Sequence, residues 1–265
     1  MNHSQEILPV EMRKIIRKNK FNKHTSGVCN GYVQANVVIL PEVYAEDFRK
    51  FAEANKEAVP ILEEIKNGAF AFKTVAKDSD IRKDVPKYKI FRNGEFVETK
   101  ASLEGIWQKD FVTFLLGCSF SFENAFMKQG IPVRHIEQDR NVPMYITSKP
   151  CVPAGRFSGN MVVSMRGIPK DQVDEAVAIT RMYPLAHGEP VHIGNPEDIG
   201  IVDINQPDFG DAVEMKAGDV PVFWPCGVTP QNAAKNAKPN IMITHFPGHM
   251  FITDLKDEAI KVQKN

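Results

Sequence analysis

Residue types with catalytic chemistry gather at four abrupt turns of the sequence. These turns are GCSFSFE at 117–123, SMRG at 164–167, HGEPVHIGNP at 187–196 and FWPCGVTPQ at 223–231. Each joins a predicted strand or helix to a loop, and such loops carry most active sites because a rigid scaffold positions them. The four turns together predict a composite site for a small molecule.

The turn at 117–123 could bind an anionic group. Its glycine leads into a predicted helix, whose first backbone N–H groups and positive dipole end favour an anion or a thiolate. Ser119 and Ser121 are then candidates for substrate binding. Cys118 and Glu123 are candidates for catalysis. A structural alternative has equal weight: Ser119 caps the helix, Cys118 is packed and Glu123 complements the dipole.

Arg166 ends the apolar run NMVVSM, which predicts a strand. A guanidinium group at the end of a strand can bind a carboxylate through two parallel hydrogen bonds. Ser164 shares its face, because side chains two residues apart in a strand point to the same side. Both are therefore candidates for substrate binding, and the alternative for Arg166 is a structural ion pair with an aspartate.

His187 and His192 are candidates for proton transfer, because an imidazole titrates near neutral pH. Gly188 and Pro190 lie between them and prevent the continuous helix that a HExxH-type metal site needs. Further potential ligands follow without a recognised spacing: Asp203, Asp208, Asp211, His245 and His249. We therefore expect no metal and no cofactor, and the alternative for each histidine is a structural hydrogen bond.

The turn after Trp224 contains Cys226, Gly227 and Thr229. A strand that passes into such a turn can expose a nucleophile or a group of backbone amides that binds an anion. All three residues are candidates for substrate binding. Thr229 could instead cap a helix that begins at Pro230, a role that the sequence slightly favours, and Cys226 could simply be packed.

Alternating strand and helix signals must position these turns. Gln34–Leu40 predicts a strand, and the fifteen residues after Pro41 place their apolar side chains on one helical face. Asn93-Gly94 predicts a type I′ hairpin between Tyr88–Phe91 and Phe96–Thr99. Helices are predicted from Ser102 through Trp107, Phe111 and Leu115, over Ser119–Gln129, and over 171–182. Further strands are predicted at 144–147, 161–165, 191–193, 220–224, 241–245 and 250–253.

This order of elements predicts an α/β protein with two α/β domains and a cleft between them. The larger, discontinuous domain has three layers around a mixed sheet and comprises residues 1–117 plus 238–265. Residues 118–237 form a smaller, inserted two-layer domain.

Composition and charge exclude several classes of protein. The 33 basic side chains balance 33 acidic ones, which removes the electrostatic argument for nucleic acid binding. The basic residues at 13–23 are interpreted as the solvated face of a helix and its exit. The first fourteen residues lack the apolar core of a secretory signal, and no apolar run is long enough to span a bilayer. The four cysteines form no CxxC motif, so we expect reduced thiols and a cytoplasmic protein, with a symmetric homo-oligomer as the general expectation.

A series of distinctive segments resembles the D-glutamate cyclase family, whose bacterial members are commonly described as hydro-lyases. The segments are QANVVILP, DIRKDVPKYKIFRNG, GCSFSFE, VPMYITS, VVSMR, HGEPVHIG, GIVDINQPDFGD, VFWPCGVTPQ and THFPGHMFITD, and they extend over nearly the whole chain. The resemblance implies a two-part α/β protein that removes water from D-glutamate to close 5-oxo-D-proline. It implies no catalytic residue list.

Such a cyclisation needs a base, an acid and a group that stabilises an oxyanion. We assign the substrate carboxylate to Arg166, proton transfer to His187 or His192, the complementary carboxyl group to Glu123 or Asp203, and the oxyanion to loop amides near Cys118 and Gly227. Two alternatives stay open. One is a hydro-lyase whose metal is bound by His187, His192 and an aspartate, and the other is a non-catalytic protein that binds carboxylate ligands.

Overall fold

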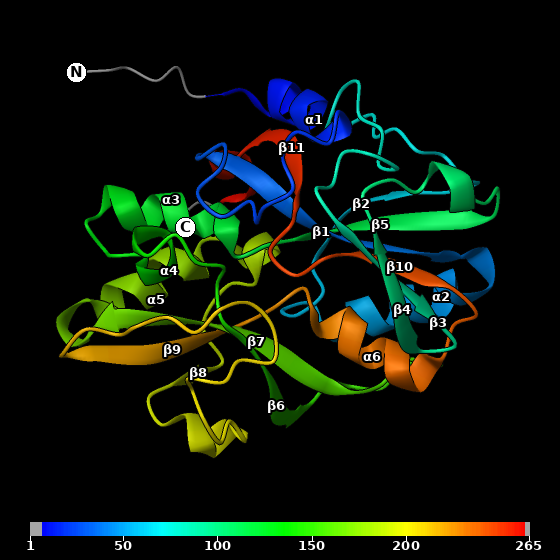
Figure 1. The fold of residues 1–265 in the computed structure, drawn as a ribbon. Coiled ribbons are helices and arrows are strands. Elements are labelled where there is room, and N and C mark those ends of the chain that lie inside the picture. The colour runs from blue at the N-terminus through cyan, green and yellow to red at the C-terminus, as the bar shows by residue number, and fades with distance from the viewer. Residues whose placement is uncertain (1–6, 263–265) are drawn as a thin grey trace.

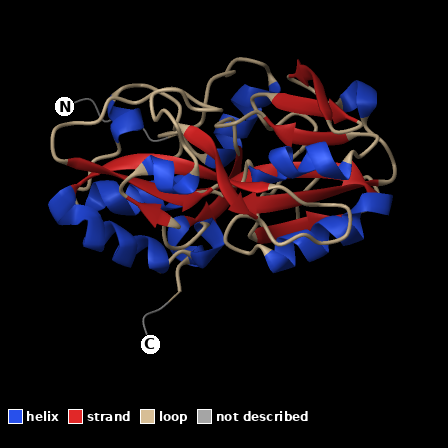
Figure 2. Ribbon diagram, turned by 90° about the horizontal axis from the view of Figure 1, so that it is seen from below, coloured by secondary structure: helices blue, strands red, loops and turns tan. Residues whose placement is uncertain are grey.

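Two antiparallel sheets form the framework of the protein, and they lie side by side (Figures 1 and 2). The structure is a computed structural model and describes residues 7–262. The argument against a secretory signal rests partly on residues 1–6, which lie outside the described residues. Within the described part, no helix combines the length and apolarity that crossing a bilayer requires.

The larger sheet has seven strands in the order β2-β5-β1-β10-β3-β4, and β11 also pairs with β1. Its strands are β1 (Tyr32–Pro41), β2 (Ile61–Ile65), β3 (Tyr88–Arg92), β4 (Glu95–Lys100), β5 (Phe111–Gly117), β10 (Met242–His245) and β11 (Phe251–Lys256). Every strand pair in it runs antiparallel. The α/β class is confirmed, but the expectation that this sheet mixes parallel and antiparallel strands is wrong.

The smaller sheet has the order β6-β7-β9-β8 and is also antiparallel. Its strands are β6 (Met144–Pro150), β7 (Asn160–Pro169), β8 (His192–Ile193) and β9 (Asp219–Pro225). The helices are α1 (Pro9–Arg17), α2 (Glu42–Ala54), α3 (Phe120–Lys128), α4 (Arg134–Glu137), α5 (Val173–Arg181) and α6 (Thr229–Ala237), with short 3₁₀ turns that include Glu104–Ile106 and Pro184–Ala186. The division into domains at residues 117 and 238 stays a prediction.

The predicted helix through Phe111 and Leu115 is wrong, because this segment is strand β5. Phe111 and Leu115 pack on one face of the larger sheet, and Phe114 and Leu116 pack on the other. A strand that is buried on both faces is apolar at every position, so its sequence mimics the one-sided pattern of a helix. The remaining predicted helices and strands are present, with ends shifted by a few residues.

Different elements cover the two faces of the larger sheet. Helices α2 and α6 contribute side chains to the core on one face. The other face is covered by a segment at 69–87 with little regular structure, which contributes Phe72, Val75 and Ile81. Around the smaller sheet, α3 and α5 pack against Trp224.

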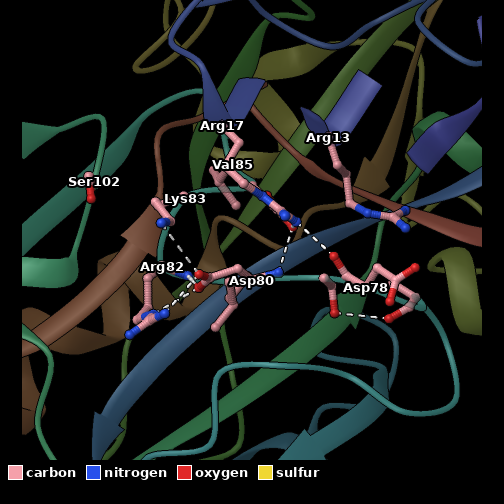
Figure 3. Close-up of polar contacts among 12 residues, drawn as sticks. Arg13, Arg17, Asp78, Asp80, Arg82, Lys83, Val85 and Ser102 are labelled. Atoms are coloured by element: carbon pink, nitrogen blue, oxygen red, sulfur yellow. Dashed lines mark hydrogen bonds and ion pairs between the residues drawn. The ribbon is translucent and has the colours of Figure 1, made fainter. Parts of the chain in front are cut away.

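Ion pairs hold the irregular segment in place (Figure 3). Arg82 and Lys83 both point toward Asp80, with Arg82 Nε at 2.8 Å and Lys83 Nζ at 3.8 Å from its carboxylate oxygens. Arg17 on α1 reaches down to Asp84, with Nε at 2.6 Å from Oδ1. The helix carrying the N-terminal basic residues is therefore not solvated throughout.

Arg13 is even less exposed to solvent than Arg17. Its side chain is buried, and its Nη1 lies 2.8 Å from Asp254 Oδ1 on β11. The neighbouring Lys14 and Lys18 are exposed, as the sequence predicts. Because Arg13 and Arg17 are paired with carboxylates of other segments, these two side chains act as structural anchors.

Candidate functional site

A cavity of about 630 Å³ lies where elements of the two sheets meet, and we call it the inter-sheet cavity. Its walls come from β3, from the segment that precedes β6, from the segment at 208–211, and from the turn that joins β10 to β11. The residues that line it are Lys23, His24, Lys89, Asn141, Asp208, Phe209, Gly210, Asp211, Phe246, Pro247 and His249. Its volume suits a small organic ligand.

Thr25 fastens the N-terminal wall of the cavity to the β10–β11 turn. Its backbone N–H donates to Gly248 O at 2.8 Å, and its Oγ1 accepts from Met250 N–H at 3.0 Å. This places His24 in electrostatic contact with His249. Gly248 itself has φ +80°, and an added Cβ would lie 2.1 Å from Asn141 Oδ1, so only glycine fits this turn.

The two aspartates of the cavity are already engaged by backbone donors. Asp208 Oδ2 accepts from Ile146 N–H at 2.7 Å, and Asp211 Oδ2 accepts from Asn141 N–H at 2.8 Å. These carboxylates fix the loop at 208–211 against the start of β6.

Lys89 projects from β3 into aromatic surroundings. Its Nζ lies 4.9 Å from the ring centre of Phe96, 5.3 Å from that of Phe91 and 5.4 Å from that of Phe209. Among residues 7–262, no carboxylate pairs with it. Burial lowers the pKa of Lys89, and the positive charge of Lys235 on α6 lowers it further.

His24 and His249 supply the cavity with proton acceptors. Burial lowers the pKa of both imidazoles below the usual value, which leaves them neutral at pH 7. His24 Nδ1 is buried and has no hydrogen-bond partner among the described residues. A neutral imidazole beside a polar cavity can accept a proton from a ligand.

The structure brings four of the sequence-predicted residues together in a buried group, the Arg166 cluster, which consists of Arg166, Glu123, Ser119 and Ser164. Arg166 Nε donates to Glu123 Oε1 at 3.1 Å, and its Nη2 also donates to that oxygen. Arg166 Nη1 donates to Ser164 Oγ at 2.8 Å. Its Nη2 donates to Ser119 Oγ at 3.0 Å.

The Arg166 cluster is closed to solvent and satisfied internally. The side chains of Arg166 and Glu123 are 0% and 2% exposed, and neither lines the inter-sheet cavity. Burial favours a raised pKa for the Glu123 carboxyl group, but nearby His135 and Arg166 outweigh it and hold the pKa below its usual range. This geometry is that of a structural ion pair, formed with a glutamate where the sequence suggested an aspartate.

An apolar layer of side chains packs against the wall of the inter-sheet cavity. Cys118, Cys226 and Phe120 pack in one group with Met250 and the partly buried Phe209, a residue of the cavity wall. Burial raises the pKa of Cys226 to about 11 and that of Cys118 further. Both thiols are therefore protonated at neutral pH, and neither has the thiolate character of a nucleophile.

His187 lies apart from the cavity, in a turn that packs against the end of β5. Its Nδ1 donates to Glu57 O at 2.7 Å, and burial lowers the pKa of the imidazole to about 4. The approach is so close that a Cβ on Gly117 would lie 1.5 Å from Leu185 O. His187 thus has the structural hydrogen bond that the sequence analysis gave as its alternative role.

His192 and Asp203 lie on the opposite face of the smaller sheet from Arg166. His192 pairs with Phe223 across β8 and β9, and their rings are 5.8 Å apart. Phe223 belongs to the core on the outer face, whereas Arg166 points to the face covered by α3. Among the described residues, Asp203 accepts hydrogen bonds within its own turn, from residues 205 and 206. The structure therefore does not bring these two candidates together with Arg166.

The remaining candidates fix the backbone. Ser121 Oγ accepts from Gln34 N–H at 3.3 Å. Gly227 packs against Asn36, because an added Cβ would lie 2.1 Å from its Nδ2. Thr229 Oγ1 accepts from Val162 N–H at 3.0 Å and so joins the start of α6 to β7. The predicted cap by Thr229 is wrong, because α6 begins at Thr229 and Val228 occupies the cap position.

The sequence does not single out Lys89, Asn141 or His24 as candidate site residues. Lys89 is one lysine of an ordinary amphipathic hairpin, and its surroundings arise only when Phe209 comes within reach. His249 carries a weak signal, the Pro-Gly-His turn between two apolar strands. Within residues 7–262, no group of three or more His, Cys, Asp or Glu side chains has the arrangement of a metal site.

Comparison with known proteins gives consistent matches. A family model described as D-glutamate cyclase matches residues 112–254. A Clostridium beijerinckii protein is 54% identical over 96% of this chain and 97% of its own, and a Bacillus licheniformis protein is 52% identical over 98% and 99%. Both are named "Putative hydro-lyase". Among solved structures, a nitrogen repressor-like protein from Methanococcus jannaschii matches with TM-score 0.39 and 11% identity, covering 93% of this chain and 98% of its own.

Proposed function

The chain belongs to the D-glutamate cyclase family, and from this premise we propose that it is a hydro-lyase that closes D-glutamate to 5-oxo-D-proline in the inter-sheet cavity. The observation that carries the proposal is the meeting, in one cavity of suitable size, of two neutral imidazoles and a lysine that pairs with no carboxylate of the described residues. These are the groups that a zwitterionic dicarboxylate and its cyclisation require.

The reaction moves two protons from the amine nitrogen to the oxygen that leaves. The α-ammonium group first loses a proton, and the free amine then attacks the γ-carboxyl carbon to give a tetrahedral intermediate. One oxygen of that carbon takes up protons and leaves as water, which completes the lactam ring. Nitrogen gives up a second proton once the C–N bond has formed, so the enzyme must accept two protons at nitrogen in turn and return two at the departing oxygen.

We assign these steps to residues of the cavity. His249 or His24 accepts the proton of the α-ammonium group, because both imidazoles are neutral at pH 7. The resulting imidazolium then protonates the departing oxygen, and the imidazole so regenerated carries the second proton from nitrogen to the same oxygen. Lys89 and Lys23 bind the carboxylates and stabilise the negative charge that develops on the intermediate. Asn141 offers an amide group at the same wall.

The Arg166 cluster supports this site through the apolar layer. It joins α3 to β7, and Phe120 at the start of α3 packs with Met250, which follows His249. The centre of the His135 ring lies 6.1 Å from that of Phe120. We therefore propose Arg166 and Glu123 as positioning residues that keep the cavity wall in place. This replaces the direct carboxylate contact expected from the sequence.

A cytoplasmic location fits the same proposal. Cys118, Cys151 and Cys226 are buried, and none of the three forms a disulfide among the described residues. Unpaired thiols are the usual state in a reducing compartment. Fractionation of the native cells, followed by detection with a specific antibody, tests this location.

The proposed reaction is tested by NMR on the purified protein. Separate samples with D-glutamate, L-glutamate and 5-oxo-D-proline are followed for ring closure and opening against a protein-free control. We expect enzyme-dependent conversion of the D isomer. Stabilisation by these ligands without any turnover would favour the carboxylate-binding alternative, and activity lost on chelation would favour the metal-dependent one.

A further inference from the structure

Lys89 has surroundings that favour amine chemistry as well as charge pairing. Three aromatic rings surround its ammonium group within 5.4 Å, and no carboxylate of the described residues pairs with it. The side chain nevertheless reaches a cavity of about 630 Å³ that small molecules can enter. Such a lysine is shielded from bulk water and still accessible to a ligand.

Burial by the aromatic rings and the charge of Lys235 both favour the neutral form of the Lys89 amine. The rings displace water from Nζ, and their attraction for a cation does not restore the hydration that is lost. Lys235 on α6 adds a second positive charge, and together these effects lower the pKa of Lys89. Desolvation and a neighbouring cation are the two means by which lysines become nucleophilic at neutral pH.

We propose that Lys89 is a carbonyl-reactive amine and that the inter-sheet cavity captures 2-oxo carboxylic acids as an imine at this residue. The ligand class follows from the cavity. Lys23 lines the same cavity, and no carboxylate of the described residues pairs with it, so it can bind the carboxylate of such a ligand. The inference does not depend on the cyclase reaction, because it needs only Lys89 and access to the cavity.

The chemistry is a condensation without net oxidation. Lys89 Nζ, as the neutral amine, attacks the C2 carbonyl carbon and forms a carbinolamine. The carbonyl oxygen then leaves as water together with both protons that the amine nitrogen carried, and a C=N bond replaces the C=O bond. Water reverses the reaction, so the adduct is stable only after reduction.

The test is reductive trapping on the full chain. The protein is incubated with 2-oxoglutarate and sodium cyanoborohydride, which delivers hydride to the imine carbon and leaves a secondary amine. We expect a mass increase of one reduced adduct per chain, and peptide mapping should locate it at Lys89. Succinate, which lacks the carbonyl group, should give no adduct and should slow the labelling by competition.

Two variants and one matched control complete the test. Lys89→Met should lose the adduct, and Lys89→Arg should lose it too while it keeps the positive charge and so guards against a folding defect. Lys87→Met is the control, because Lys87 is also half-buried and its Nζ lies 4.4 Å from the ring centre of Phe246. It should retain the full adduct.

Labelling spread evenly over exposed lysines, or undiminished in folded Lys89→Arg, overturns the proposal. Because the readout is mass, the result stands apart from turnover of D-glutamate. A protein without cyclase activity that is labelled at Lys89 would refute only the proposed function. An active cyclase without the adduct would refute only this inference.

Discussion

Arg166 and Glu123 form an ion pair that is sealed from solvent, with side chains 0% and 2% exposed. The pair joins β7 of the smaller sheet to α3, and Ser119 and Ser164 satisfy further guanidinium donors. A buried pair of this kind contributes little net stability by itself, but the loss of one partner leaves a charge without compensation in the interior.

This relationship predicts a large effect of single substitutions on stability. Arg166→Met and Glu123→Gln should each lower the free energy of unfolding by about 3–5 kcal/mol, as measured by urea denaturation. The double variant should lose clearly less than the sum of the two, because it leaves no unpaired charge.

The surface pair between Arg156 and Asp47 offers a control for this prediction, since its side chains are 48% and 24% exposed. Arg156→Met should cost at most about 1 kcal/mol. Additive losses in the Arg166 and Glu123 double variant would show that the two side chains stabilise the fold independently.

The sequence predicts those parts of the fold that local chemistry determines. Asn93 and Gly94 have φ +50° and +84°, the positive values that a type I′ hairpin needs, and β3 and β4 flank them as expected. Strand β5 was not predicted, because an apolar run buried on both faces has the same composition in a helix and in a strand.

The candidate site is predicted less well, for a physical reason. The pairing of Glu123 with Arg166 joins residues 43 positions apart, and the surroundings of Lys89 depend on Phe209 in a distant loop. Residue type indicates which side chains can carry chemistry. Only the packing of the two sheets decides whether a guanidinium is closed in an ion pair or an amine faces a cavity.

Histidine substitutions distinguish the cavity from the sites expected from sequence. His249→Gln or His24→Gln should lower kcat for the cyclisation by roughly 10²–10⁴-fold, because a general acid–base group is lost. His192→Gln should retain turnover, since this residue lies on the far face of the smaller sheet. Loss of activity in His192→Gln alone would instead favour the sequence-based assignment.

The pH dependence of the cyclisation follows from the same imidazoles. Burial lowers the pKa of His249 and of His24, so the neutral, proton-accepting form persists below the usual pKa of histidine, about 6.5. The rate constant kcat/KM should therefore be level around pH 6.5 and fall only at more acidic pH. A decline centred at or above pH 6.5 would contradict the role of these two residues.

The cysteines should prove dispensable for turnover. Burial raises the pKa of Cys226 to about 11 and raises that of Cys118 as well, so thiolate is scarce at pH 7. Cys118→Ala and Cys226→Ala should keep their activity, and native protein should react with a disulfide reagent only after unfolding in urea. Rapid labelling of either thiol in the native state, together with inactivation, would restore a nucleophilic role.

His187 should make the free energy of unfolding depend on pH in the acid range. Its folded pKa is lowered to about 4 by burial, whereas an unfolded histidine titrates near 6.5. Between these two values the unfolded chain binds a proton that the folded protein does not, so the free energy of unfolding falls as the pH is lowered from 6.5 toward 4. His245, whose pKa is lowered to about 3, acts in the same direction.

His187→Asn removes one of these groups and should flatten the dependence by up to about 1.4 kcal/mol per pH unit within that window. Asparagine suits the position because His187 has φ +81°, a left-handed conformation that asparagine tolerates better than most residues. Urea denaturation at pH 8 gives the reference, since histidine is neutral there in both states and any loss reflects the missing ring packing and the missing Nδ1–H donor to Glu57 O. The same slope in variant and parent between pH 6.5 and 4 would mean that His187 takes up its proton in the folded protein.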